Sequence, residues 1–326
     1  MPVTAVTTDP LAHSLTLTAD YAAPPERVWR AFTDPRQLER FWGPPGWPAR
    51  FGRFELEVGG RAVYTMHGPS GDQSSGTWEF ITIRPHEQLE MTDAFSDAEG
   101  TVDAAMPVSR IRITFSPGGA GTTVKVLTEF DSLEALEQVV GMGAIEGSTM
   151  AFNQLDAVLQ GIRAYAQGRG TQAEPLGDRY LRITRLVEAP MERVWRAHTE
   201  PEQMRRWLLG PDGWRMTACE MDLYPGGRYR YAWEPEEGVE GEAFGFDGET
   251  LLLDVPRRLV TTEHMTGTEF PSTVNDLGLI EEDGATLITT LIEYPDAETR
   301  ETVLATGMTD GMEASYARLE RGLAGE

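Results

Sequence analysis

The strongest constraint on the fold of this chain is that its sequence repeats itself once. The hexapeptide Glu-Arg-Val-Trp-Arg-Ala stands at residues 26–31 and recurs unchanged at residues 192–197. Further matches follow in the same order in both halves, as a tandem duplication requires. They pair residues 43–47 with 210–214, residues 59–61 with 226–228, and Phe152, Leu155 and Leu159 with Tyr316, Leu319 and Leu323. The sequence therefore predicts two copies of one domain.

The repeat also gives the predicted domain boundaries. The first domain is expected over residues 1–166 and the second over residues 179–326, so each copy is long enough to bury its own core. Residues 167–178 between them are polar and contain three Gly and one Pro, which is typical of a linker. Because a fused duplication can replace a homodimer, we expect that the two copies can pack as an intramolecular pseudo-dimer.

The charge of the chain limits the classes of partner that it is expected to bind. The 28 basic and 52 acidic residues give a net charge of −24, which the two copies share as −9 and −15. This acidity argues against binding to nucleic acid or to anionic lipid, which requires a basic surface. No apolar run approaches the roughly 20 residues that span a bilayer, and the first residues lack the basic-then-apolar pattern of a secretion signal. We therefore expect a cytoplasmic protein with no nucleic-acid or membrane partner.

Both copies predict the same order of secondary structure. Residues 14–21 alternate apolar and polar side chains, as a half-buried strand does, and Leu181 and Ile183 repeat the pattern. Two short helices follow, the first opened by Pro25 or Pro190 and the second by an acid-Pro pair. About six strands come next, among them residues 74–84, 87–95, 108–116 and 121–131 and their counterparts in the second copy.

A long helix is predicted at the end of each copy. Apolar or small residues recur there at steps of three and four positions, which places them on one helix face. They are Ser148, Phe152, Leu155, Leu159 and Ile162 in the first copy, and Met312, Tyr316, Leu319 and Leu323 in the second.

Four motifs accompany this order of elements. An Ala-Pro-x-Glu-Arg-Val-Trp opening is present at residues 23–29 and 189–195, and an acid-Pro stretch runs from residue 34 to Trp42 and from residue 200 to Trp207. A Pro-Gly-Gly turn stands at residues 225–227, with Val-Gly-Gly at 58–60. A Pro-x-x-Leu motif stands at residues 256–259 and is loosened at 85–89. Together these features resemble the START-like (SRPBCC) superfamily, and more narrowly the domain family named after the C-terminal domain of the heat-shock-chaperone ATPase activator.

The resemblance implies an α+β fold made of two tandem helix-grip domains, each a curved antiparallel sheet wrapped around a long C-terminal helix. It also implies a cavity between sheet and helix that takes an apolar or aromatic small molecule. The chaperone-activation role is not carried over, because much of it lies in a separate domain of the eukaryotic activator. The residues expected to line the two cavities are Trp42, Trp47, Tyr64, Met66, Trp78, Asp93, Glu146, Phe152, Trp207, Trp214, Tyr229, Tyr231, Trp233, Glu263, His264, Asp310 and Tyr316.

Several of these residues have two interpretations. Trp47 and Trp214 lie in loops rich in Gly and Pro, where they either stack on a ligand at the cavity mouth or pin the loop to the sheet. Tyr64, Met66, Tyr229, Tyr231 and Trp233 face the cavity only if the strand parity is right, since a shift of one residue turns them all outward.

Two pairs of acids occupy equivalent positions in the copies. Glu146 and Asp310 each lie between two glycines four residues apart, a spacing that leaves one helix face bare for a ligand or a close sheet. Asp93 and Glu263 align within a strand. Each acid is either a hydrogen-bonding group or general base inside the cavity, or a solvated surface residue.

Other chemistry is not indicated. The five histidines are scattered and the single Cys219 reads as a buried, inert thiol, so neither a metal site nor a cofactor is predicted. No phosphate loop, dinucleotide fingerprint or nucleophile elbow is present. His198 lies on the apolar side of its predicted helix and reads as a packed core histidine.

Three functions fit these residues. The leading hypothesis is sequestration of an apolar or aromatic small molecule without covalent chemistry. The second is an enzyme of the polyketide cyclase or hydrolase type that uses a cavity carboxylate or His264 as acid or base. The third is a chaperone-associated interaction module. A raised carboxyl pKa in the cavity favours the enzyme, and a filled core with an exposed apolar patch favours the module.

Overall fold

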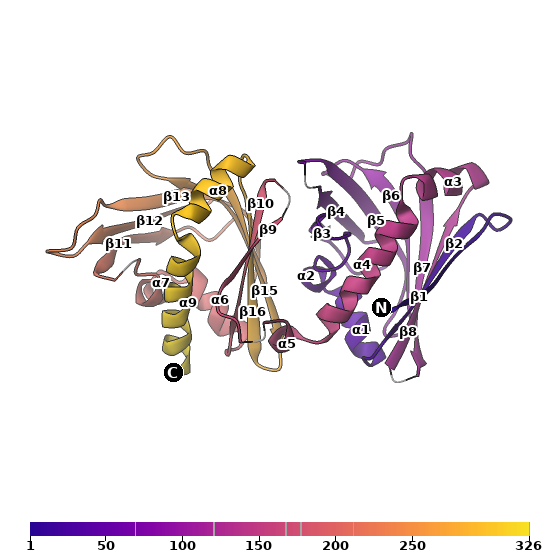
Figure 1. Cartoon of the computed structure of the whole chain (residues 1–326), viewed down its shortest axis with the longest axis horizontal. Helices are drawn as coiled ribbons and strands as arrows, with labels where there is room; N and C mark the ends of the chain where they lie inside the picture. The colour runs from indigo at the N-terminus through magenta and orange to yellow at the C-terminus, as the bar shows by residue number, and fades with distance from the viewer. Residues whose placement is uncertain (69, 120, 167, 177, 211, 326) are drawn as a thin grey trace. The chain divides into compact units, whose positions relative to one another are not determined.

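Two eight-stranded antiparallel sheets, one in each half of the chain, form the frame of the structure (Figure 1). The computed structural model describes residues 1–68, 70–119, 121–166, 168–176, 178–210 and 212–325. The chain divides into two units, Met1–Gln160 and Gly161–Glu326, which we call domain 1 and domain 2. Each consists of one sheet with helices on it, so the two tandem helix-grip domains expected from the sequence are confirmed.

Domain 1 has the strand order β1-β2-β8-β7-β6-β5-β4-β3, in which every pair of neighbours is antiparallel. Helices α1 and α2 connect β2 to β3, and helices α3 and α4 follow the last strand. The elements are β1 (Val3–Asp9), β2 (Ser14–Tyr21), α1 (Pro25–Thr33), α2 (Pro35–Leu38), β3 (Ala49–Phe54), β4 (Arg61–His67), β5 (Gln73–Arg84), β6 (Gln88–Ser96), β7 (Val108–Gly118), β8 (Gly121–Phe130), α3 (Leu133–Gly141) and α4 (Ala144–Leu159).

Domain 2 repeats this plan, with the strand order β11-β12-β13-β14-β15-β16-β10-β9. Its elements are α5 (Ile162–Ala166), β9 (Gln172–Leu176), β10 (Tyr180–Val187), α6 (Met191–Thr199), α7 (Pro201–Trp207), β11 (Trp214–Met221), β12 (Arg228–Pro235), β13 (Phe244–Asp254), β14 (Arg258–Met265), β15 (Thr273–Glu282), β16 (Ala285–Glu293), α8 (Ala297–Ala305) and α9 (Met308–Ala324).

Local sequence explains the first helices. Pro25 takes the first turn of α1, where its missing N–H costs nothing, and the helix buries Val28, Trp29 and Phe32 along one side. The chain then becomes extended at Asp34, whose carboxylate accepts a hydrogen bond of 3.0 Å from the backbone N–H of Arg36. This cap starts α2, so the acid-Pro pair separates two short helices as the sequence predicts.

The C-terminal helices differ in part from the prediction. Gly143 and Gly307 adopt left-handed φ angles of +88° and +81° at the N-caps of α4 and α9, which separates these helices from α3 and α8. A residue with a Cβ is strained in this conformation, so the two glycines end one helix and start the next. Helix α4 ends at Leu159, and Gly161 with φ +87° follows it.

The division between the domains therefore falls at Gln160, six residues before the predicted end of domain 1. Ile162, expected on the long helix of the first copy, is buried against Ile280 and Leu287 in domain 2. Part of the predicted linker is strand β9, which pairs with β10. Gln167 and Gly177 of that linker lie outside the described residues.

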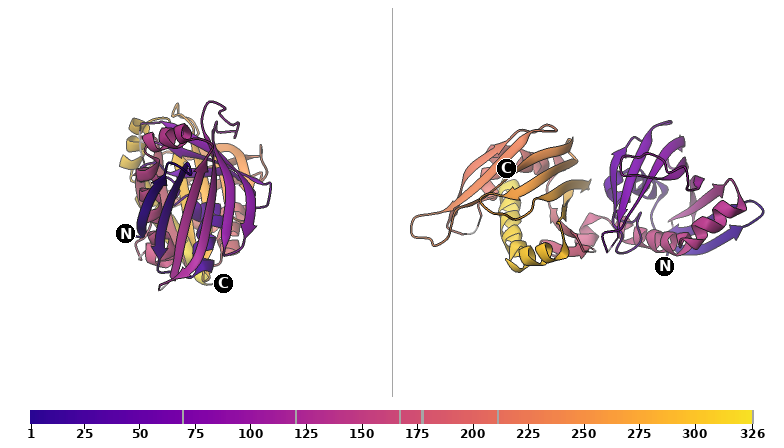
Figure 2. Two further views of the ribbon diagram at one scale, coloured as in Figure 1. Left: turned by 90° about the vertical axis from the view of Figure 1, so that its right-hand side faces the viewer. Right: turned by 90° about the horizontal axis from the view of Figure 1, so that it is seen from above.

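One helix covers one face of each sheet. Helix α4 lies across the sheet of domain 1 and α9 across that of domain 2 (Figures 1 and 2). We call these covered faces the inner faces. In domain 1 the inner face, α1 and α4 form one continuous core that includes Phe32, Trp78, Phe152 and Leu155. The core of domain 2 is divided into separate clusters, one around Trp207 and Tyr316 and another around Tyr229 and Trp233.

Candidate functional site

Three polar or aromatic side chains of domain 1 meet on the inner face of three neighbouring strands. Tyr64 lies on β4, Trp78 on β5 and Asp93 on β6. The strand register places Tyr64 opposite Gly76 and Trp78 opposite Asp93. Residues at alternate positions of a strand share a face, so all three side chains point toward α4. Asp93, chosen from the sequence as a candidate, therefore lies inside the domain.

Aromatic rings surround this carboxyl group. The Trp42 and Trp78 rings meet edge to face with centroids 4.7 Å apart, and Tyr64 lies 5.5 Å from Trp78. Phe152 of α4 approaches Trp42 at 6.5 Å, so the C-terminal helix contributes to the same group. Four of the residues expected to line a cavity are thus brought together around Asp93.

The Asp93 carboxyl is the titratable centre of this group. Burial raises its pKa to about 6. The Trp78 N–H and the Tyr64 hydroxyl act in the opposite direction, because they stabilise the carboxylate. The Tyr64 hydroxyl donates to Asp93 Oδ1 over 3.4 Å. Asp93 is enclosed by protein atoms but keeps part of its accessible surface, as do Trp42 and Met66. The raised pKa places the titration of the Asp93 carboxyl near neutrality.

One hydrogen-bonding group beside Asp93 is not satisfied. Trp78 is only 2% exposed, and its Nε1 atom makes no hydrogen bond of acceptable geometry with any described residue. The same N–H is nevertheless close enough to Asp93 to lower the pKa of that carboxyl. A buried donor without an acceptor costs free energy, so this N–H is open to an acceptor that joins it.

Domain 2 has a similar acid–tyrosine pair, Glu263 and Tyr229. Burial raises the pKa of Glu263 on β14, while Asn275 and Tyr229 lower it by hydrogen bonding to the carboxylate. The Tyr229 hydroxyl donates to the Thr262 carbonyl over 2.8 Å and lies 3.5 Å from Glu263 Oε2. Burial raises the pKa of Tyr231 and Tyr294, and the negative charge of Glu263 raises both further. Asn275 was not predicted, although it shares its strand face with the apolar Leu277 and Leu279 of the core.

The other aromatic residues of domain 2 form two groups. Trp233 stacks on Phe244 with centroids 5.1 Å apart, and Tyr231 lies in the same group. Trp207 stacks on Tyr316 of α9 at 5.7 Å. His198 lies in this second group, where burial lowers its pKa to about 4 and keeps the ring neutral. It is a packed core histidine, in agreement with the sequence prediction.

Trp47 and Trp214, both expected in loops, pack against glycines. A Cβ on Gly68 would lie 2.7 Å from the Trp47 ring, and one on Gly241 would lie 2.4 Å from the Trp214 ring. Trp214 also contacts Phe244 at 5.2 Å. Trp47 therefore packs its loop against the end of β4, whereas Trp214 is the first residue of β11 and packs against Gly241 in the β12–β13 loop. Both tryptophans have packing partners within their domain, which favours the packing interpretation over ligand stacking.

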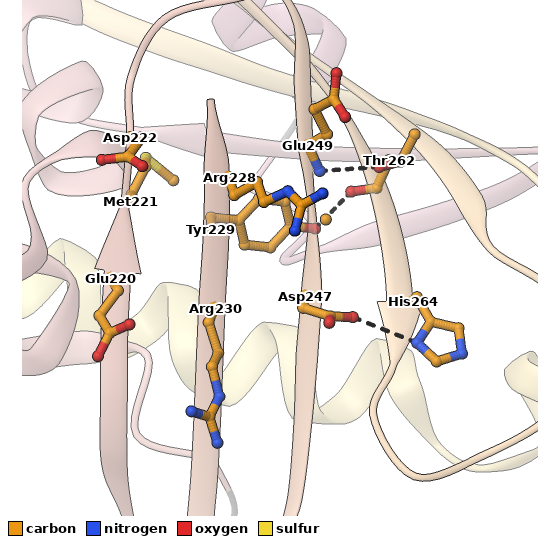
Figure 3. A pocket seen from close by; sticks show the side chains of 11 residues that line it. Glu220, Met221, Asp222, Arg228, Tyr229, Arg230, Asp247, Glu249, Thr262 and His264 are labelled. Atoms are coloured by element: carbon orange, nitrogen blue, oxygen red, sulfur yellow. Dashed lines mark hydrogen bonds and ion pairs between the residues drawn. The ribbon is translucent and has the colours of Figure 1, made fainter. Parts of the chain in front are cut away.

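His264 lies on the opposite face of its sheet from the predicted one. It follows Glu263 in β14, and adjacent residues of a strand point to opposite faces. Its ring contacts Asp247 at 3.3 Å in a polar groove of about 600 Å³ on the outer face (Figure 3). This groove is lined by Glu220, Asp222, Asp247 and Glu249 together with Arg228, Arg230 and His264, so it is not the apolar cavity expected from the resemblance.

Of the two interpretations of Glu146 and Asp310, the structure favours the solvated surface position. Both side chains are exposed at the starts of α4 and α9. Six residues separate them from Phe152 and Tyr316, which turns them by about 120° from the inward direction. Gly147 and Gly311 beside them face open space, since an added Cβ would meet nothing within 4 Å. These two glycines therefore do not allow a close approach of the sheet.

No group of three or more potential metal-binding side chains occurs among the described residues. In the same part of the chain, no helix is long and apolar enough to cross a membrane. Cys219 is buried, and burial raises the pKa of its thiol.

Comparison with known proteins agrees with the fold. The model of the family "Activator of Hsp90 ATPase homolog 1-like protein" matches residues 22–160 and again residues 188–324. No curated protein sequence matches the chain. Protein Ms6760 from Mycobacterium smegmatis is 41% identical over 48% of this chain and 97% of its own, with a TM-score of 0.46. A protein from Arthrobacter aurescens is 39% identical over 48% of this chain and 92% of its own, with a TM-score of 0.47.

One solved structure extends over both domains. DynU16, a protein of the dynemicin biosynthetic locus, covers 96% of this chain and 97% of its own at 15% identity, with a TM-score of 0.34. The two family matches together span most of the 326 residues, and each falls on one helix-grip domain. The chain therefore belongs to the Activator of Hsp90 ATPase homolog 1-like family and carries its domain in two tandem copies.

Proposed function

We propose that the protein binds small aromatic or apolar molecules in the interior of its domains, between the inner face of the sheet and the C-terminal helix. The single observation that carries this proposal is the pair of enclosed carboxyl groups, Asp93 and Glu263, at equivalent positions among aromatic rings. An interior acid costs stability, so its presence in both copies supports a role in binding.

The surroundings of the two acids suit such a ligand. Aromatic side chains supply the flat apolar surface on which a ring packs, and a few placed polar groups set its orientation. Burial of apolar ligand surface contributes about 25 cal/mol per Å². A polar ligand without a ring would lose that contribution and still have to displace water from the carboxyl.

A thermal-unfolding screen of the full chain against naphthalene-sized compounds tests this proposal. A ligand at about 100 times its Kd stabilises the domain that it binds by roughly 2.7 kcal/mol, which raises the Tm of a domain of this size by about 5–11 °C. We expect aromatic compounds to produce such a shift and matched sugars to produce none. If no aromatic compound shifts either unfolding transition at saturation, the proposal is wrong.

A second function is favoured by the pKa of Asp93. A carboxyl group with a pKa of about 6 is half ionised close to neutral pH and is suited to proton transfer. Its carboxylate would remove an α-proton from a bound aryl ketone and return a proton from solvent to the same carbon. Deuterium incorporation from D₂O into such a ketone, followed by NMR, tests this activity. The Asp93→Asn variant should abolish the enzyme-dependent exchange, and equal exchange with both proteins would exclude Asp93 as the base.

A further inference from the structure

The two copies differ at two positions beside the enclosed acid. Trp78 lies opposite Asp93 in domain 1, and the corresponding position of β13 in domain 2 is Gly248. Asn275 in domain 2 takes the place of Ile111 in domain 1, since each is two residues beyond the partner of the acid on the next strand. The acid of domain 2 therefore lies beside an amide, whereas the acid of domain 1 lies beside an indole N–H.

In domain 1, the Trp78 N–H and the Asp93 carboxyl both have hydrogen-bonding capacity that is not used. Trp78 Nε1 is a buried donor that makes no well-aligned hydrogen bond with a described residue, although it lies close to the Asp93 carboxyl and the Tyr64 hydroxyl. Asp93 receives one long bond of 3.4 Å from Tyr64 and retains accessible surface. A carboxylate has room for several hydrogen bonds, so acceptor capacity remains on Asp93 next to the unsatisfied donor. The two groups together call for an atom that accepts one hydrogen bond and donates another.

We propose that the domain 1 site recognises a hydroxyl group on an aromatic ligand, whose oxygen accepts from Trp78 Nε1–H and whose O–H donates to Asp93. This inference rests on the proposed function and adds to it the chemical class of the ligand, a phenol or aryl alcohol. The rings of Trp42, Tyr64 and Phe152 supply the surface for its apolar part. A carbonyl group satisfies only the indole N–H, and a methyl group satisfies neither.

Two other features, the polar groove of domain 2 and the buried His198 ring, support a ligand site less well. The polar groove of domain 2 has acids and arginines that can compensate one another, as Arg215 and Glu234 do nearby on β11 and β12. The unpartnered Nε2 of His198 lies in a well-packed group with Trp207 and Tyr316, where the ring is 9% exposed. Of these three features of the described residues, the domain 1 site is the one that combines an unsatisfied donor with a partly exposed acidic residue.

The test compares 2-naphthol with 2-methylnaphthalene, which has nearly the same shape but no hydroxyl group. The full chain is labelled with ¹⁵N at the tryptophan indoles, and the Trp78 resonance is assigned by its loss in Trp78→Phe. We expect 2-naphthol to shift this resonance downfield, as a new hydrogen bond does, and 2-methylnaphthalene to leave it near its free position. The readout reports on domain 1 even if both domains bind the compound.

Affinity provides a second measurement. Calorimetry of the full chain should give 2-naphthol a roughly tenfold advantage over 2-methylnaphthalene, the value of one charge-assisted hydrogen bond. Trp78→Phe and Asp93→Asn should each remove most of this advantage. Trp29→Phe is the matched control, because Trp29 is a buried tryptophan of the same domain that contacts Phe115 and His86.

The possible results separate the two proposals. Binding of both compounds with equal affinity and equal shifts of the Trp78 resonance would overturn the hydroxyl assignment and leave the proposed function standing. Loss of the advantage in Trp29→Phe as well would also overturn it, because a general loosening of the core would then explain the effect. Failure of both compounds to bind would overturn the proposed function and this inference with it.

Discussion

The Tyr64 hydroxyl bonds to Asp93 across the sheet of domain 1 at 3.4 Å, passing over the side of Gly76. Domain 2 makes the same kind of contact between Tyr229 and Glu263, but its tyrosine stands two positions earlier in the strand. Tyr231 is the residue that corresponds to Tyr64 by sequence. Each tyrosine lies opposite a glycine of the next strand, Gly76 or Gly248, so the glycine makes room for the ring. The copies keep a tyrosine–acid contact by two different arrangements.

Replacing Tyr64 by Phe tests this contact. Burial raises the pKa of Asp93, and the Tyr64 hydroxyl lowers it by stabilising the carboxylate. Removal of the hydroxyl should therefore raise the Asp93 pKa above its value of about 6. The measurement is a ¹³C NMR titration of the Asp93 carboxyl in wild type and variant. An unchanged or lower pKa in the variant would show that the hydroxyl does not bond to the carboxylate in solution.

The raised pKa of Asp93 also predicts how stability depends on pH. The folded-state pKa of about 6 lies above the unfolded value of about 3.9, so the folded state binds the proton more tightly. Stability is therefore lost as the pH rises from about 4 to 6, and the ionised group costs on the order of 2–3 kcal/mol at higher pH. Asp93→Asn removes this cost and should stabilise domain 1 at pH 8 more than at pH 4.

Urea unfolding of wild type and Asp93→Asn at pH 4 and pH 8 checks that prediction. The Glu146→Gln variant is the matched control, because it also neutralises an acid of domain 1 but one that is exposed. Its effect should be within about 0.5 kcal/mol at either pH. A loss of stability in Asp93→Asn at pH 8 would mean that the ionised carboxylate stabilises the fold.

Replacement by Ala should change stability in opposite directions at Gly143, the N-cap of α4, and at Gly147 within that helix. Gly147→Ala should stabilise domain 1 by about 0.5–1 kcal/mol, because the added Cβ meets no atom within 4 Å and alanine favours the helix. Gly143→Ala should destabilise it by a similar amount or more, because φ is +88° at that position. Chemical denaturation of both variants measures the difference. Equal effects of the same sign would contradict the assignment of Gly143 as a left-handed cap.

Cys219 provides a probe of domain 2. Its thiol is 4% exposed and burial raises its pKa, so both access and ionisation are suppressed in the folded state. We expect a disulfide reagent to modify it slowly at pH 8 under native conditions and rapidly in denaturant. Fast modification of the native protein would show that the cluster around Cys219 and Tyr231 opens readily.

Much of this fold follows from the sequence because its signals are local or repeated. The duplicated hexapeptide identifies two copies, and alternation in β12 correctly turns Tyr229, Tyr231 and Trp233 to the buried side. Strand β1 is not apparent from the sequence because its edge position leaves most of it exposed, so its residues show no regular alternation. The domain boundary is displaced because the periodicity of α4 continues by coincidence into Ile162.

The sequence could predict which residues belong to the candidate site, but not how their side chains are placed relative to one another. The equivalence of Asp93 and Glu263 was visible in the alignment of the copies, and strand parity excludes His264 once Glu263 points inward. The proximity of Trp78 to Asp93 depends on strand register, which hairpin lengths and the irregularity between Phe80 and Thr82 determine. No local pattern reveals that the Trp78 N–H lacks a partner, since this depends on the packing of three strands.

A crystal structure of the full chain with a bromine-labelled 2-naphthol tests the central claim most directly. Anomalous scattering locates the bromine without reference to any assumed pose. The account predicts a peak between the inner face of the domain 1 sheet and α4, with the hydroxyl oxygen within hydrogen-bond distance of Trp78 Nε1 and Asp93. A peak confined to an outer face, such as the polar groove around Arg230 and His264, would contradict it.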